Sequence, residues 1–140
     1  MVDYIFMLSA LLIASITDIK SNTIPIPLFP VVFSIDVTYS FFNNVHIWDK
    51  SIALLVAFIT FCLLAKFGDG GGGDILMMSC LGWCLGLNAL LHTTIIAVIA
   101  VVIFSFIRKE KVIPFAPFVL LGTTIHLINV LTWYEPVYLF

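Results

Sequence analysis

Long apolar stretches dominate the chain and leave few polar residues to cover a surface. Of its 140 residues, 62% are hydrophobic and only 10% are charged. A soluble domain is about half apolar and about a quarter charged, so this sequence cannot cover a surface that faces water. Its six Lys and Arg residues form no basic stripe, which excludes a nucleic-acid partner. The composition therefore predicts an integral membrane protein surrounded by the lipid bilayer.

The apolar stretches are continuous, which favours helices, because the strands of a membrane barrel alternate in polarity. A membrane helix needs about 20 residues, with a tolerance of about 17 to 25. We therefore expect an all-α, polytopic membrane bundle of about six transmembrane helices, forming a single domain over residues 1–140. The six segments are Val2–Thr17, Pro27–Phe42, Ser51–Phe67, Ile75–Leu91, Thr93–Ile107 and Pro114–Trp133. The weakest break between them lies near Asn88–His92.

The positive charges predict how the bundle is oriented. Cytoplasmic loops of membrane proteins carry an excess of Lys and Arg, and only Lys50 lies in an even-numbered loop. The odd-numbered loops are therefore expected in the cytoplasm and both termini outside, in the cell membrane. The start of the chain is acidic and lacks a cleavage pattern, so we interpret it as a retained first helix. The residues in or beside odd-numbered loops are Lys20, Lys66, Arg108, Lys109 and Lys111.

Two acidic residues lie at the edges of predicted helices on the cytoplasmic side. Asp18 ends the first helix, and Asp74 begins the fourth, directly after a run of glycines. Two carboxylates at one depth can act as an acid/base pair, although both can also be interfacial acids that cap helices. Gly71, Gly72 and Gly73 leave space for an extended peptide beside Asp74, or form a flexible turn. The pattern makes Asp18 and Asp74 candidate catalytic residues and the glycines candidate substrate-binding residues.

The remaining polar residues have simpler expected roles. Asp36 lies in the middle of a helix, so it should be protonated, paired or facing a polar cavity. Asp69, with glycine beside it, is expected to be a hydrated surface acid. His126 is expected to form an interhelical hydrogen bond. We expect no metal, ligand or catalytic role for the three cysteines and three histidines, which are Cys62, Cys80, Cys84, His46, His92 and His126.

Several motifs, taken together, resemble one family. Gly71–Asp74 reads as the G-x-G-D signature of membrane aspartyl proteases, and Met77–Gly86 is similar to its continuation in type IV prepilin peptidases. Asp18, followed by Ile24-Pro25, resembles the first catalytic aspartate of that family and its Ile-Pro sequence. Ile113–Phe118 is similar to the Pro-Phe-x-Pro segment that opens the last helix. The chain therefore resembles the short, peptidase-only members of the type IV prepilin peptidase family.

This resemblance implies an aspartic endopeptidase that cuts the leader from prepilin-like precursors. The cut would fall on the cytoplasmic side, after a small residue and just before the hydrophobic helix of the pilin. Asp18 and Asp74 would be the catalytic pair, with no metal or cofactor. No methyltransferase activity is expected, because the paired C-x-x-C motifs of the longer members are missing from these residues. The chain has Leu76 where many members carry Lys and Ile26 where many carry Asn, which bears on substrate choice.

Two other interpretations compete with the prepilin peptidase. An archaeal-type preflagellin peptidase would use the same chemistry on a different precursor. A proton-coupled transporter or a membrane subunit of pilus assembly would use Asp18, Asp36 and Asp74 as a proton relay. A relay normally places charged residues along several helices, whereas here two acids lie at one edge beside glycines.

Overall fold

The computed structural model describes residues 2–43, 47–67, 71–108 and 113–133, and the described chain is almost entirely α-helical. Three helices are long and apolar enough to cross a membrane, and the other two are shorter but also apolar. The five helices are α1 (Val2–Ser21), α2 (Leu28–Phe42), α3 (Ile47–Phe67), α4 (Gly72–Arg108) and α5 (Ala116–Trp133). The predicted all-α membrane bundle is confirmed.

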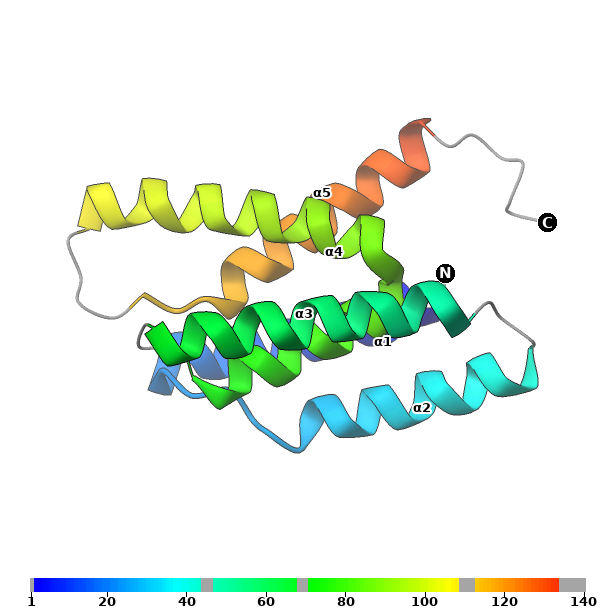
Figure 1. The fold of residues 1–140 in the computed structure, drawn as a ribbon. Helices are drawn as coiled ribbons and strands as arrows, with labels where there is room; N and C mark the ends of the chain where they lie inside the picture. The colour runs from blue at the N-terminus through cyan, green and yellow to red at the C-terminus, as the bar shows by residue number, and fades with distance from the viewer. Residues whose placement is uncertain (1, 44–46, 68–70, 109–112, 134–140) are drawn as a thin grey trace.

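Helix α4 contains both the fourth and the fifth predicted segments. It is interrupted at Gly86, whose φ of 81° and ψ of 176° are not helical. The part before Gly86 runs beside α3, and the part after it runs in the opposite direction beside α5 (Figure 1). The predicted break near Asn88–His92 was therefore misplaced, since those residues are helical. Only glycine adopts a φ near +80° without strain, and this identifies Gly86 as the point where the chain turns back.

Helices of the bundle run in opposite directions, so that their termini lie on two opposite sides of it (Figure 1). The last turn of α1, the last turn of α3, and the first turns of α4 and α5 share one end. The first turns of α1 and α3 lie at the other end, together with the end of α2 (Figure 1). This arrangement brings short segments that are distant in sequence into a single neighbourhood.

Small residues allow the helices to approach closely. A Cβ atom added at Gly82 of α4 would lie 2.8 Å from the carbonyl oxygen of Ala53 in α3. A Cβ atom added at Gly122 of α5 would lie 2.7 Å from the carbonyl oxygen of Thr93 in α4. Such contacts between small residues are typical of membrane helices, which associate through close packing rather than through a hydrophobic driving force. They fix α3 and α5 against α4.

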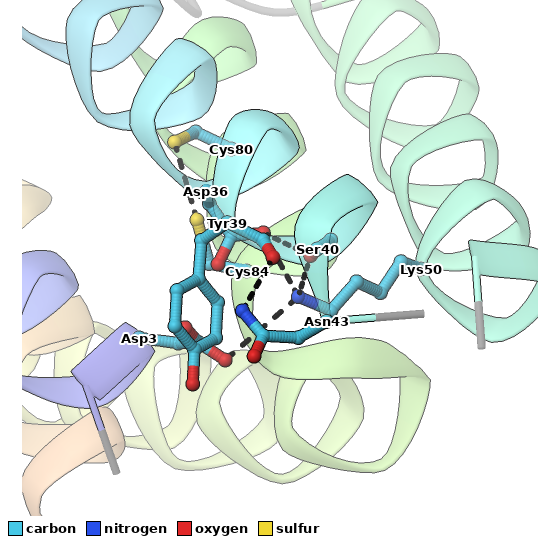
Figure 2. Close-up of polar contacts among 8 residues, drawn as sticks. All are labelled: Asp3, Asp36, Tyr39, Ser40, Asn43, Lys50, Cys80 and Cys84. Carbon is cyan, nitrogen blue, oxygen red and sulfur yellow. Dashed lines mark hydrogen bonds and ion pairs between the residues drawn. The ribbon is translucent and has the colours of Figure 1, made fainter. Parts of the chain in front are cut away.

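Asp36 is paired, which was one of its three expected states. Its Oδ2 atom lies 2.8 Å from the Lys50 Nζ atom, which also donates a hydrogen bond to Ser40 at 3.0 Å. Figure 2 shows this cluster, with Asp3 of α1 approaching the same Lys50 at 3.8 Å. Lys50 was expected in a loop, but α3 begins at Ile47 and therefore contains it. The ion pair is buried and connects α2 to α3.

The described cysteines form no disulfide, and two of the histidines face each other across helices. Cys80 and Cys84 are buried with their sulfur atoms 3.9 Å apart, and all three cysteines are free. His126 is buried and its Nδ1 atom lies 3.1 Å from that of His92, so the predicted interhelical hydrogen bond is confirmed. Several residues singled out above lie outside the described parts of the chain, namely His46, Asp69, Lys109 and Lys111.

Candidate active site

Asp18 is a buried carboxylate in the last turn of α1, with only 6% of its surface exposed. Asp18 was expected to end the helix, directly after the apolar stretch that stops at Thr17, but the helix continues to Ser21, so Asp18 lies inside it. Asn22 follows with a φ of 49° and donates its backbone N–H to the carbonyl oxygen of Asp18 at 2.8 Å. This left-handed residue ends the helix in the manner of a C-terminal cap. The helix end therefore fixes the backbone that carries Asp18.

The Asp18 side chain has a partner that the sequence did not indicate. Its Oδ2 atom accepts a hydrogen bond of 3.0 Å from the backbone N–H of Ala116, the first residue of α5. The first N–H groups of a helix have no partner within the helix, and a carboxylate can satisfy one of them. Pro117 has no N–H, so Ala116 is the last donor before the helical bonds begin. The Pro-Phe-x-Pro segment thus presents the Ala116 N–H to Asp18.

Asp74 is half-buried in the first turn of α4. Its backbone N–H donates to the carbonyl oxygen of Gly71 at 3.1 Å, which closes the turn that opens the helix. A helix N-terminus carries partial positive charge and stabilises a nearby carboxylate. Asp74 is therefore a carboxylate placed by backbone geometry at the start of an apolar helix.

The structure brings Asp18 and Asp74 to the same cavity, which has a volume of about 360 Å³. The two residues come from opposite ends of different helices, which meet at one end of the bundle (Figure 1). The cavity also contains Asn22, Thr23 and the segment before α5, so it combines polar and apolar walls. Its remaining lining residues are Ile24, Ile26, Gly71, Gly73, Ile113 and Phe115.

The three candidate glycines have different surroundings. A Cβ atom at Gly73 would lie 2.9 Å from the Cβ atom of Ile24, a distance that folded proteins do not accommodate. A Cβ atom at Gly71 would lie 3.7 Å from the Oδ2 atom of Asp74, in ordinary contact. A Cβ atom at Gly72 would have no neighbour within 4 Å among the atoms of the described structure. Only Gly73 is thus required by close packing, and it holds the Ile24-Pro25 segment against α4.

No other acidic residue in the described part of the chain lines this cavity. Asp36 pairs with Lys50 on α2 and α3 and contributes no side chain to the cavity that contains Asp18 and Asp74. Within the described ranges, no group of three His, Cys, Asp or Glu side chains is arranged to hold a metal ion.

Two carboxylates that face one cavity can together hold a proton, deliver it to a bound carbonyl and accept one from water.

The fold and this cavity define a helical membrane protein with two carboxylates at one end of its bundle. The family model described as the type IV leader peptidase family matches residues 5–106, so the chain belongs to that family of proteases. The matched region contains Asp18 and Gly71–Asp74 and ends before α5. No curated protein and no solved structure matches the chain.

Proposed function

We propose that this chain is an aspartic endopeptidase that removes the leader from prepilin-like precursors at the cytoplasmic face of the cell membrane. The observation that carries the proposal is the single cavity that contains Asp18 and Asp74. Membership in the leader peptidase family supports the class of reaction. The excess of Lys and Arg in the odd-numbered loops supports the cytoplasmic side.

The two carboxylates would share the proton transfers of peptide hydrolysis. One carboxylate, ionised, accepts a proton from water as the water oxygen attacks the peptide carbonyl carbon. The other, protonated, donates its proton to the carbonyl oxygen. The tetrahedral intermediate then releases the amine as its C–N bond breaks: the amine takes up the proton held by the first carboxylate, and a hydroxyl of the intermediate returns a proton to the second as the C=O bond re-forms. The Ala116 N–H holds the Asp18 carboxylate in place during these steps.

The position of Asp36 favours a peptidase over a proton relay. A relay through Asp18, Asp36 and Asp74 needs the three carboxyl groups to communicate across the bundle. Asp36 is instead bound to Lys50 and Ser40, away from the cavity. A buried carboxylate held by a lysine is suited to joining helices, whereas Asp18 and Asp74 share a cavity with space for a ligand.

The experiment measures cleavage of a precursor by the purified protein in detergent, normalised to folded protein. Asp18→Asn and Asp74→Asn should each lose essentially all activity, by about a hundredfold or more. Asparagine keeps the size and polarity of aspartate but cannot exchange the proton. Asp69→Asn, in the same glycine-rich segment, is the matched control and should keep most activity. Full activity in either Asp18→Asn or Asp74→Asn would refute the catalytic pair.

A further inference from the structure

Two histidines from different helices face each other away from the candidate active site. His92 follows the Gly86 turn in α4, and His126 lies in the second half of α5. Their Nδ1 atoms are 3.1 Å apart, and the centroids of their rings are 5.2 Å apart. Neither histidine lines the cavity that contains Asp18 and Asp74. The pair therefore stands outside the proposed catalytic machinery.

The distance between the two Nδ1 atoms suits a chelated metal ion as well as a hydrogen bond. A histidine nitrogen binds Zn²⁺ at about 2.0 to 2.1 Å, so two such nitrogens at a tetrahedral angle lie about 3.3 to 3.4 Å apart. The observed 3.1 Å falls short of that spacing by only a few tenths of an ångström. In the hydrogen bond, one ring carries its hydrogen on Nδ1. When that hydrogen moves to Nε2 of the same ring, both Nδ1 atoms offer a lone pair to an ion between them.

The surrounding helices hold the pair in place. A Cβ atom added at Gly122 would lie 2.7 Å from the carbonyl oxygen of Thr93, the residue that follows His92. Gly122 also lies four residues before His126, on the same face of α5. The ring of Tyr4 in α1 stacks on that of His126, with the centroids 6.3 Å apart and the planes 23° apart. Close packing and a stacked ring thus reduce the ordering that binding of an ion would require.

The two imidazoles differ in exposure. His126 is buried, whereas His92 is exposed and lies six residues, or about 9 Å along the helix, from the turn at Gly86. An ion can therefore reach the pair from the His92 side, and water can occupy its remaining coordination positions, as it does in open metal sites. Taken singly, neither histidine indicated a metal site, because 34 positions separate them in the sequence.

We propose that His92 and His126 together bind one divalent transition-metal ion, which bridges α4 and α5. Imidazole nitrogen suits Zn²⁺, Cu²⁺ and Ni²⁺, whereas Mg²⁺ and Ca²⁺ prefer oxygen ligands. The described residues supply two ligands, and water supplies the others. This site goes beyond the proposed peptidase activity, because it uses neither of the carboxylates in the cavity.

The test uses Cu²⁺ as the probe, because nitrogen sites bind it most tightly among these ions. Purified protein in detergent, without a histidine tag, should bind one Cu²⁺ ion per chain, and its electron paramagnetic resonance spectrum should show two imidazole nitrogens. His92→Gln and His126→Gln should each lower the affinity for Cu²⁺ by about tenfold to a hundredfold or more, since loss of even an outer partner of a ligand costs that much. His46→Gln removes the third histidine of the chain and should leave the affinity unchanged. An equal concentration of Mg²⁺ should not compete.

The double variant shows whether one ion binds both rings. If it does, adding His126→Gln to His92→Gln should cost little further affinity, because the two ligands act as a unit. An equal loss in His46→Gln, summed losses in the double variant, or a wild-type spectrum with a single nitrogen would overturn the chelate. The wild-type spectrum decides the question even if a variant fails to fold. Asp18→Asn should bind Cu²⁺ as the wild type does, so this result and that of the cleavage experiment are independent.

Discussion

Gly73 shows how one residue connects two parts of the site. Gly71 and Gly72 are also glycines, yet of the three only Gly73 has a neighbouring side chain too close for a Cβ atom. That neighbour is Ile24, which begins the Ile-Pro sequence after Asp18. The close approach therefore holds the segment that follows one catalytic candidate against the helix that carries the other. The two fixed positions of the G-x-G-D signature face atoms of the site, whereas its variable position, Gly72, faces open space.

Gly73→Ala is expected to abolish most cleavage and to destabilise the fold. The added methyl group would lie 2.9 Å from the Cβ atom of Ile24, so shortening the Ile24 side chain to alanine cannot relieve the clash. Overpacking of this kind costs about 1 to 3 kcal/mol, and displacement of Asp74 by about 1 Å can cost about a hundredfold in rate. Cleavage rate and thermal unfolding in detergent measure the two effects.

The matched control for Gly73→Ala is Gly72→Ala, one residue earlier. Its methyl group meets no atom of the described structure within 4 Å, so activity and unfolding temperature should stay close to wild type. Equal damage from both substitutions would show that the glycines serve backbone freedom in general. It would also remove the argument that Gly73 acts through Ile24.

At the scale of elements, one buried ion pair joins α2 to α3, two helices that both pack against α4. Helix α2 packs on α4 and α1, and the Asp36–Lys50 pair ties it to the start of α3. Lys50 has only 7% of its surface exposed and Asp36 only 5%. Removing one partner of a buried pair leaves an uncompensated charge, which is strongly destabilising. The pair should therefore matter for stability rather than for catalysis.

Lys50→Met is expected to lower the free energy of unfolding by about 3 to 5 kcal/mol, because Asp36 remains buried without its cation. Lys66→Met removes an exposed lysine from the other end of the same helix and should have little effect. Thermal unfolding in detergent compares the two variants. The double variant Asp36→Leu, Lys50→Met should recover most of the loss. An unchanged unfolding temperature in Lys50→Met would mean that the pair does not hold α2.

At the scale of the whole molecule, the catalytic candidates and two of the described lysines gather at one end. The ends of α1 and α3 and the starts of α4 and α5 lie there (Figure 1), and Lys20 and Lys66 belong to those ends. The interruption of α4 at Gly86 makes this arrangement possible, since it returns the chain to the same end before α5 begins. A continuous α4 would instead place the start of α5 far from Asp18.

Reporter fusions should place this end in the cytoplasm. Fusions after Lys20 and Phe67 are expected to report the cytoplasm, and fusions at Val45 and Phe140, two positions outside the described residues, the exterior. The reason is the bias of positive charge: Lys20 and Lys66 lie at this end and Arg108, Lys109 and Lys111 come before α5 in the sequence, whereas Lys50 lies inside α3 at the other end. A cytoplasmic report at Phe140 would contradict the proposed topology. Exterior reports at Lys20 and Phe67 would place the cavity on the other face of the membrane.

The sequence by itself determined the class of protein and the approximate helices. In a bilayer every backbone polar group must be satisfied within the protein, and a continuous apolar run that does not alternate in polarity satisfies its groups as a helix. The same local signals placed Asp18 and Asp74 at helix edges, and the G-x-G-D resemblance selected them. Helix ends were less accurate: the apolar pattern stopped before Asp18, which lies inside α1, and it began the third helix after Lys50, which lies inside α3.

Only the tertiary structure decided which residues meet. The bond from Ala116 to Asp18, the contact of Gly73 with Ile24 and the Asp36–Lys50 pair each join residues on different elements. No periodicity within one segment encodes such pairings, because they depend on how helices cross and how closely they pack. The turn at Gly86 has the same origin, since a lone glycine within an apolar run is compatible with an unbroken helix. Local hydrophobicity thus sets the elements, and packing between elements creates the cavity.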